Sequence, residues 1–139
     1  MAQIIREAEV TTEALLALLS RAFLNAHVDA DGDVYITDGL DFPIWLAIDQ
    51  EQRLLRFFTF ISRDPNEQTP FTDVGANHLN ATVVVPTFCV PADRKDRLCS
   101  HYVLPFTDGV IDTHVIAAAR RFAGASAYGA QRLDEVVFH

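Results

Sequence analysis

The sequence has very little lysine, few cysteines and no long apolar run, and these shortages exclude several classes of protein. Lys95 is the single lysine among 139 residues, and 19 acidic residues against 11 basic ones give a formal net charge of −8. A nucleic-acid-binding surface needs a basic face, so we expect no nucleic-acid partner and favour neutral or basic ones. The apolar runs are far shorter than the roughly 20 residues that cross a bilayer, so we expect no membrane partner.

The first ten residues, Met1–Val10, lack the apolar core of a secretion signal. They contain Arg6, Glu7 and Glu9 instead, which is typical of neither a signal peptide nor a membrane anchor. We therefore expect a cytoplasmic protein whose cysteines stay reduced.

Long linkers, low-complexity tracts and internal repeats are also missing, so the sequence marks no domain boundary. Half of the residues are hydrophobic, and a chain of this length buries roughly two thirds of the surface that its unfolded form exposes. We predict one folded domain over residues 1–139.

Hydrophobic periodicity and turn residues predict an α+β domain. Hydroxyl or carboxylate side chains precede each stripe of helical spacing, at Thr11, Thr72 and Asp112. The polar segment Ser62–Pro70 is predicted to be an internal loop. The predicted elements are a helix over about 12–24, strands over 33–37, 42–49 and 53–61, a helix over about 73–81, strands over 82–90 and 98–106, and a helix from 112. The order α-βββ-α-ββ-α predicts one antiparallel sheet of about five strands with helices.

The segment Leu54–Ile61 has apolar residues on both faces of its predicted strand. A strand with one face in water alternates apolar and polar residues, and this segment does not. One face has Leu55, Phe57 and Ile61, and the other has Leu54, Phe58 and Phe60. Either helices cover both faces within one chain, or a second chain covers one of them. Because three helices are few for two faces of five strands, we favour a homodimer.

Three aspartates at alternate positions, Asp29, Asp31 and Asp33, resemble the start of a calcium-binding loop. The full EF-hand pattern needs a glycine and a glutamate further on, where this chain has Val34 and Leu40. We therefore interpret the segment as a solvated hairpin turn, since Asp-Gly is a common turn dipeptide. We assign it no metal.

The two cysteines and one histidine come into register if residues 91–97 form a hairpin loop. That loop places Cys89 opposite Cys99. Thr87 then lies opposite His101, which puts the histidine on the same face as both cysteines. These three side chains are of the types that bind zinc, and a fourth ligand is not defined by the pattern.

Several roles remain open for this cluster. It could form a metal site, with His78 or His114 as the fourth ligand, or a redox disulfide. Free cysteine is usually a small buried hydrophobe, so we expect no metal and no cofactor. A Cys99–His101 pair has no third group to orient the imidazole, and Ser126 does not lie in a nucleophile elbow. We predict no catalytic residue and a protein that is not an enzyme.

Short segments spread over nearly the whole chain carry a family resemblance. In the first half they are Asp31–Ile36, Pro43–Asp49 and Leu54–Phe57. In the second half they are Ala76–Asn80, Val103–Phe106, Asp108–Ile111 and Ala117–Phe122. In these segments and in element order, the chain resembles the YbjN family of small bacterial proteins. It departs in having Pro86 and Pro105 within the second hairpin, where proline cannot donate a ladder hydrogen bond.

The resemblance implies an α+β fold like that of type III secretion chaperones. Those chaperones are small, acidic and usually homodimeric, and they hold partly unfolded segments of other proteins. Proteins like YbjN are described as candidate regulators of sensory transduction, with no established catalytic residues to transfer.

We therefore expect a non-enzymatic, homodimeric, chaperone-like or regulatory protein that binds an extended protein segment on an apolar sheet surface or at a sheet edge. The candidate contacts are Trp45, Arg56, Phe58 and Phe60. The alternatives are a metal- or redox-responsive protein or enzyme built on the cysteines and histidine, and a small-molecule sensor with a pocket between sheet and helices.

Overall fold

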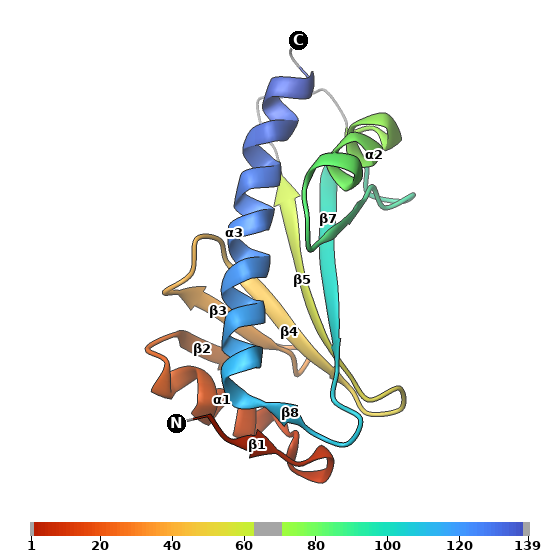
Figure 1. Cartoon of the computed structure of the whole chain (residues 1–139). Coiled ribbons are helices and arrows are strands. Elements are labelled where there is room, and N and C mark those ends of the chain that lie inside the picture. The colour runs from red at the N-terminus through yellow and green to blue at the C-terminus, as the bar shows by residue number, and fades with distance from the viewer. Residues whose placement is uncertain (1, 63–70, 138–139) are drawn as a thin grey trace.

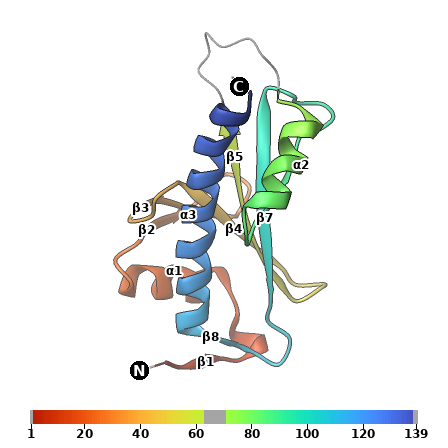
Figure 2. The same ribbon diagram turned by 45° about the horizontal axis from the view of Figure 1, so that its top comes forward.

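The computed structural model describes residues 2–62 and 71–137, and their side chains as far as residue 132. The loop predicted over Ser62–Pro70 lies, apart from Ser62, outside the described residues. The chain forms a six-stranded antiparallel sheet of order β2-β3-β4-β5-β7-β6 and a separate two-stranded pair, β1-β8. The long helix α3 crosses the sheet, with α1 and α2 beside it (Figures 1 and 2).

The elements have the following bounds in chain order. They are β1 (Ile4–Ile5), a 3-10 turn η1 (Glu7–Glu9), α1 (Thr12–Arg21), β2 (Asn25–Val28), β3 (Val34–Asp38), β4 (Ile44–Asp49), β5 (Leu54–Ser62), α2 (Asp73–Thr82), β6 (Thr87–Cys89), β7 (Arg97–Pro105), β8 (Val110–Ile111) and α3 (Asp112–Val137). No helix in the described residues is both long enough and apolar enough to span a bilayer.

The α+β class and the antiparallel sheet are as predicted, but the sheet has six strands instead of about five. The sequence prediction missed β2, which lies between α1 and β3 and forms one edge of the sheet. Its residues are mostly exposed, so they lack the alternation that reveals a half-buried strand. It pairs with β3 through His27 and Tyr35, among others.

The strand predicted over residues 82–90 is much shorter in the structure. α2 continues to Thr82, and only Thr87–Cys89 pairs with β7. Val85 has a φ of 97° and Pro86 has no amide hydrogen, so neither can continue a regular ladder. The Asn80 side chain donates to the Phe88 carbonyl at 2.9 Å and accepts from the Phe88 amide at 2.7 Å.

Two predicted helix caps are present. The Thr11 hydroxyl accepts from the amide of Ala14, and the Thr72 hydroxyl accepts from the amide of Gly75. α1 ends at Arg21, earlier than predicted, because Phe23 adopts a left-handed φ of 62°. This conformation lets the next amide bond back to the helix, which is a common way for a helix to end.

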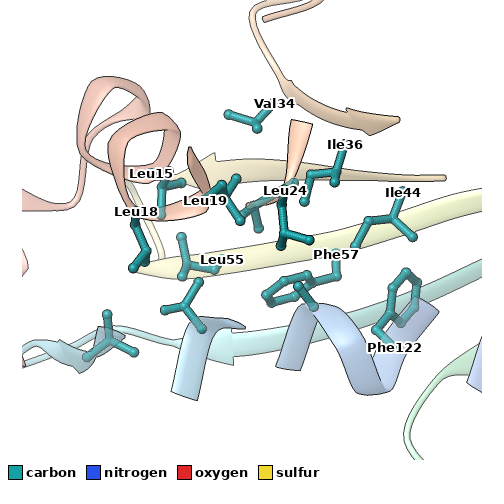
Figure 3. Close-up of a cluster of buried hydrophobic side chains, with 14 of the residues drawn as sticks. Leu15, Leu18, Leu19, Leu24, Val34, Ile36, Ile44, Leu55, Phe57 and Phe122 are labelled. Atoms are coloured by element: carbon teal, nitrogen blue, oxygen red, sulfur yellow. The ribbon is translucent and has the colours of Figure 1, made fainter. Parts of the chain in front are cut away.

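All three helices pack on one face of the six-stranded sheet, which we call the covered face. Leucines of α1 meet Leu55 and Phe57 of β5, and Phe122 of α3 lies 6.2 Å from Phe57 between ring centroids (Figure 3). At the other end of the sheet, Leu79 of α2 packs with Phe88 of β6 and its strand neighbours. The covered face is therefore the protein's core.

One polar contact lies within this core. The Ser100 and Ser126 hydroxyls hydrogen-bond at 2.9 Å, and both residues are fully buried. The bond joins β7 to α3 and satisfies two groups that burial would otherwise penalise. Ser126 is therefore a packing residue, in agreement with its predicted lack of a nucleophile's surroundings.

Candidate functional site

The face of the six-stranded sheet that points away from α1, α2 and α3 carries no helix in the described part of the chain; we call it the open face. Along β5, Leu55, Phe57 and Ile61 lie in the core. Because side chains alternate along a strand, Arg56, Phe58 and Phe60 point to the open face, while the buried Thr59 stays on the covered face. In the described residues, helices cover one face of the two-faced strand and not both. The second chain expected on the other face stays a prediction.

Aromatic side chains form a continuous row across the open face. The strand register aligns His27 with Tyr35, Tyr35 with Trp45, and Trp45 with Phe58. Ring centroids lie 5.3 Å apart for His27 and Tyr35, and 4.4 Å apart for the stacked Tyr35 and Trp45. Trp45 lies 5.9 Å from Phe58 and 6.0 Å from Phe60. We call these five residues the aromatic row.

The four residues proposed as protein contacts all belong to this face. Trp45, Phe58 and Phe60 are half-buried in the aromatic row, and Arg56 is exposed beside it. Sequence reasoning did not select Tyr35, although it occupies the outward position between two buried residues of its strand. That alternation was the available signal.

A shallow hollow of about 390 Å³ lies over the row. Its floor includes Tyr35, Trp45, Phe58 and Phe60, and the turn 29–33 forms part of its rim. It therefore combines an aromatic floor with several carboxylates.

The turn over 29–33 is acidic and is closed by hydrogen bonds of its own. The Asp29 carboxylate accepts from the amides of Asp31 at 3.0 Å and Asp33 at 2.9 Å. Burial raises the pKa of Asp33, and the nearby charges of Asp29 and Asp31 raise it further. The segment is the hairpin turn that the sequence predicted, joining β2 to β3.

The predicted register of the second hairpin is confirmed. Cys89 pairs with Cys99, and Thr87 pairs with His101. The two sulfur atoms and an imidazole nitrogen of His101 all lie within 4.8 Å of one another. Among the described residues, these three side chains converge closely enough to bind a metal ion. Neither His78 nor His114, the fourth ligands considered from the sequence, belongs to the group.

The surroundings of this cluster are only partly shielded from solvent. Cys89 is exposed, while Cys99 and His101 are half-buried. Burial, followed by the neighbouring Cys89, raises the pKa of Cys99 to about 11. Burial and the charge of Arg56 lower the pKa of His101. A thiol with a raised pKa is a poor nucleophile at neutral pH, which weighs against thiol catalysis at Cys99.

A larger hollow of about 1060 Å³ lies between α1 and α3. Leu18, Arg21 and Ala22 line it from the α1 side, and residues 112–125 line it from α3. None of the described residues that line it belongs to a strand, so this hollow does not match the pocket between sheet and helices expected for the sensor alternative.

Comparisons with known proteins agree with the fold. No family model matches the chain, and no curated protein is similar to it in sequence. Among solved structures, the crystal structure of YbjN from E. coli, a proposed transcription regulator, superposes with a TM-score of 0.68. The superposition covers 90% of this chain and 92% of YbjN, at 12% sequence identity. The chain therefore has the YbjN fold, as the resemblance in its sequence implied.

Proposed function

We propose that the chain is a non-enzymatic, chaperone-like regulatory module that binds an extended, apolar and basic segment of a partner protein on its open face. We also propose that it acts as a homodimer. The observation that carries the proposal is the aromatic row, which forms the floor of a hollow with a carboxylate rim. The description of YbjN as a regulator supports the regulatory part by analogy of fold.

The aromatic row supplies the apolar part of the recognition. Its four larger rings, those of Tyr35, Trp45, Phe58 and Phe60, are half-buried, and the strand register holds them against one another. Aromatic side chains of this kind dominate the energetics of protein interfaces, because they bury a large area at a small cost in conformational entropy. A segment lying across the row would cover Trp45 and Phe58 together.

The acidic turn supplies the charge preference. Asp29, Asp31 and Asp33 lie at the rim of the hollow, and the whole chain carries a net charge of −8. An arginine or lysine side chain over the rings would meet both the ring faces and the carboxylates. It would also relieve the mutual repulsion that raises the pKa of Asp33.

A direct binding experiment uses Trp45, the single tryptophan, as its own reporter. A short synthetic peptide that alternates arginine with leucine is titrated into the protein, and a peptide with glutamate in place of arginine is the control. We expect only the basic peptide to change Trp45 fluorescence, with an affinity that falls as salt is added. Equal binding of both peptides, or of neither, contradicts the proposal.

Variants then locate the binding site. Phe58→Ala is expected to weaken peptide binding by about tenfold or more. The affinity is measured by fluorescence anisotropy of a labelled peptide. Asp33→Asn is expected to weaken it by a smaller factor. Val103→Ala, at an exposed β7 position, is the matched control and is expected to bind as the parent does.

The homodimer is tested separately by light scattering on the purified chain. We expect twice the chain mass. A monomer at all concentrations contradicts this part of the proposal. If Trp45→Ala converts a dimer into a monomer, the open face is the dimer contact, and the proposed segment-binding role is wrong.

A further inference from the structure

The cysteine and histidine cluster lies at the β6 edge of the open face and has no part in the proposed protein binding. One ligand-type side chain comes from β6 and two from β7, so the cluster bridges the two strands. Cys89 is exposed and is not the buried hydrophobe on which the expectation of no metal was based. In place of that expectation, we propose that Cys89, Cys99 and His101 form a site for a thiophilic divalent cation of the Zn²⁺ type, bound through both Sγ atoms and one imidazole nitrogen.

The distances suit a four-coordinate ion. Zinc binds sulfur at about 2.3 Å and imidazole nitrogen at about 2.0–2.1 Å, which separates tetrahedral ligand atoms by roughly 3.5–3.8 Å. The three ligand atoms here already lie within 4.8 Å of one another. No pair has to close by more than about 1.3 Å, which side-chain rotation can supply. The exposure of Cys89 leaves room for solvent as the fourth ligand.

The charges balance when the ion binds. Two thiols each release a proton to solvent, and a cation of charge +2 replaces them beside a neutral imidazole. The net charge of the cluster is then unchanged. The positive charges of Arg56 and Arg97 act on Cys99. Because the cluster has the same net charge with and without the ion, these two guanidinium groups repel the metal-bound cluster no more than the metal-free, protonated one.

The backbone pattern of β6 makes a disulfide the poorer use of this pair. Phe88 directs its amide and carbonyl away from β7, to the side chain of Asn80. The alternate residue Cys89 therefore directs its backbone groups toward β7 and forms a hydrogen-bonded pair with Cys99. In such a pair the two Cβ atoms lie farther apart than in a non-hydrogen-bonded pair. Their distance therefore exceeds the Cβ–Cβ spacing of about 3.8 Å that a disulfide needs by a larger margin.

The site has a structural consequence for the edge of the sheet. β6 contributes only three residues to its ladder with β7, and a strand this short is weakly held. An ion that joins Cys89 to Cys99 and His101 adds a crosslink between the two strands. Zn²⁺ is therefore expected to slow amide hydrogen exchange in β6 without changing exchange in β2 at the other edge.

The test uses the full chain, reduced and stripped of metal with a chelator, and titrates it with Co²⁺ as a spectroscopic probe. We expect one equivalent to produce a sulfur-to-cobalt charge-transfer band and the visible bands of tetrahedral Co²⁺, and Zn²⁺ to abolish both. Ca²⁺ and Mg²⁺, which prefer oxygen ligands, are expected to leave the bands unchanged.

Variants assign the ligands. Cys89→Ser, Cys99→Ser and His101→Gln are each expected to weaken Zn²⁺ affinity by more than about 100-fold, since even residues that only support a ligand are worth 10–100-fold. His114→Gln is the matched control, because His114 is exposed on α3 and belongs neither to the cluster nor to the aromatic row. Far-ultraviolet circular dichroism checks that each variant is folded.

The proposal fails if the reduced chain gives no charge-transfer band with Co²⁺, or if His114→Gln and His101→Gln bind Zn²⁺ equally. It also fails if the chain without metal proves to be a stable Cys89–Cys99 disulfide whose reduction restores no metal binding. None of these results bears on peptide binding, so this inference and the proposed function fail independently.

Discussion

The two faces of β5 differ in their surroundings far more than in their residue types. Leu55, Phe57 and Ile61 on the covered face are at most 6% exposed, because helices pack over them. Phe58 and Phe60 on the open face are half-buried, and neighbouring strands supply most of their contacts. Apolar sequence on both sides of a strand therefore builds a core on one side and a half-exposed aromatic surface on the other.

The largest effect is expected on the covered face. Phe57→Ala removes a fully buried ring that contacts both Tyr102 and Phe122, and leaves a cavity between sheet and α3. We expect unfolding free energy to fall by about 3–5 kcal/mol, measured by urea denaturation. A loss below about 1 kcal/mol would show that the covered face is not the core.

A smaller effect is expected where α3 touches the covered face at Gly129. A Cβ there would lie 2.6 Å from the ring of buried Phe88, so the Gly129→Ala variant must displace that ring. Overpacking costs about 1–3 kcal/mol and outweighs the helix propensity of alanine, about 1 kcal/mol. We expect net destabilisation in urea. Gly124→Ala is the control, since its Cβ would meet only the carboxylate end of Asp41.

A still smaller change in stability is expected on the open face. Trp45→Ala removes a half-buried ring that stacks on Tyr35 and Phe58. We expect about 1 kcal/mol of lost stability, comparable to the value of an aromatic pair. Thermal and urea unfolding measure it. A loss as large as that of Phe57→Ala would make the open face part of the core and remove the distinction between the faces.

The smallest effect is expected in the chemical reactivity of the Cys99 thiol on the open face. Because the pKa of Cys99 is raised to about 11, the thiol form predominates at neutral pH. The rate of Cys99 alkylation by iodoacetamide, located by mass spectrometry, is expected to keep rising about tenfold per pH unit until about pH 11. A plateau near pH 8 would indicate an activated thiolate and favour the enzyme alternative.

Local features of the sequence predicted much of the fold. Hydroxyl caps at Thr11 and Thr72 placed two helix starts, and the loop 91–97 determined the pairing of Cys89 with Cys99. These predictions succeed because caps and hairpin registers depend on a few neighbouring residues. β2 was missed because an exposed edge strand has no apolar alternation. Residues 82–86 were wrongly assigned to a strand because their valines favour a strand, although Pro86 disfavours one.

The candidate site was predicted in part, for a related reason. The alternation along β5 placed Phe58 and Phe60 together, but joining them to Tyr35 requires the order of the three strands β3, β4 and β5, which no local pattern contains. The role proposed for Asp33 depends on the turn 29–33 lying beside the aromatic rings, which is also a property of the folded chain.

The side chain of Asn80 has a further consequence for solubility. In the three-residue strand β6, Phe88 is the residue whose amide and carbonyl point outward, and Asn80 binds both of them. The amide of one asparagine thus occupies the hydrogen-bonding positions that a strand from another molecule would need. A strand from another molecule would have to displace this side chain in order to pair at the edge, so one asparagine opposes edge-to-edge aggregation there. Asn80→Ala is the change that would reopen this edge.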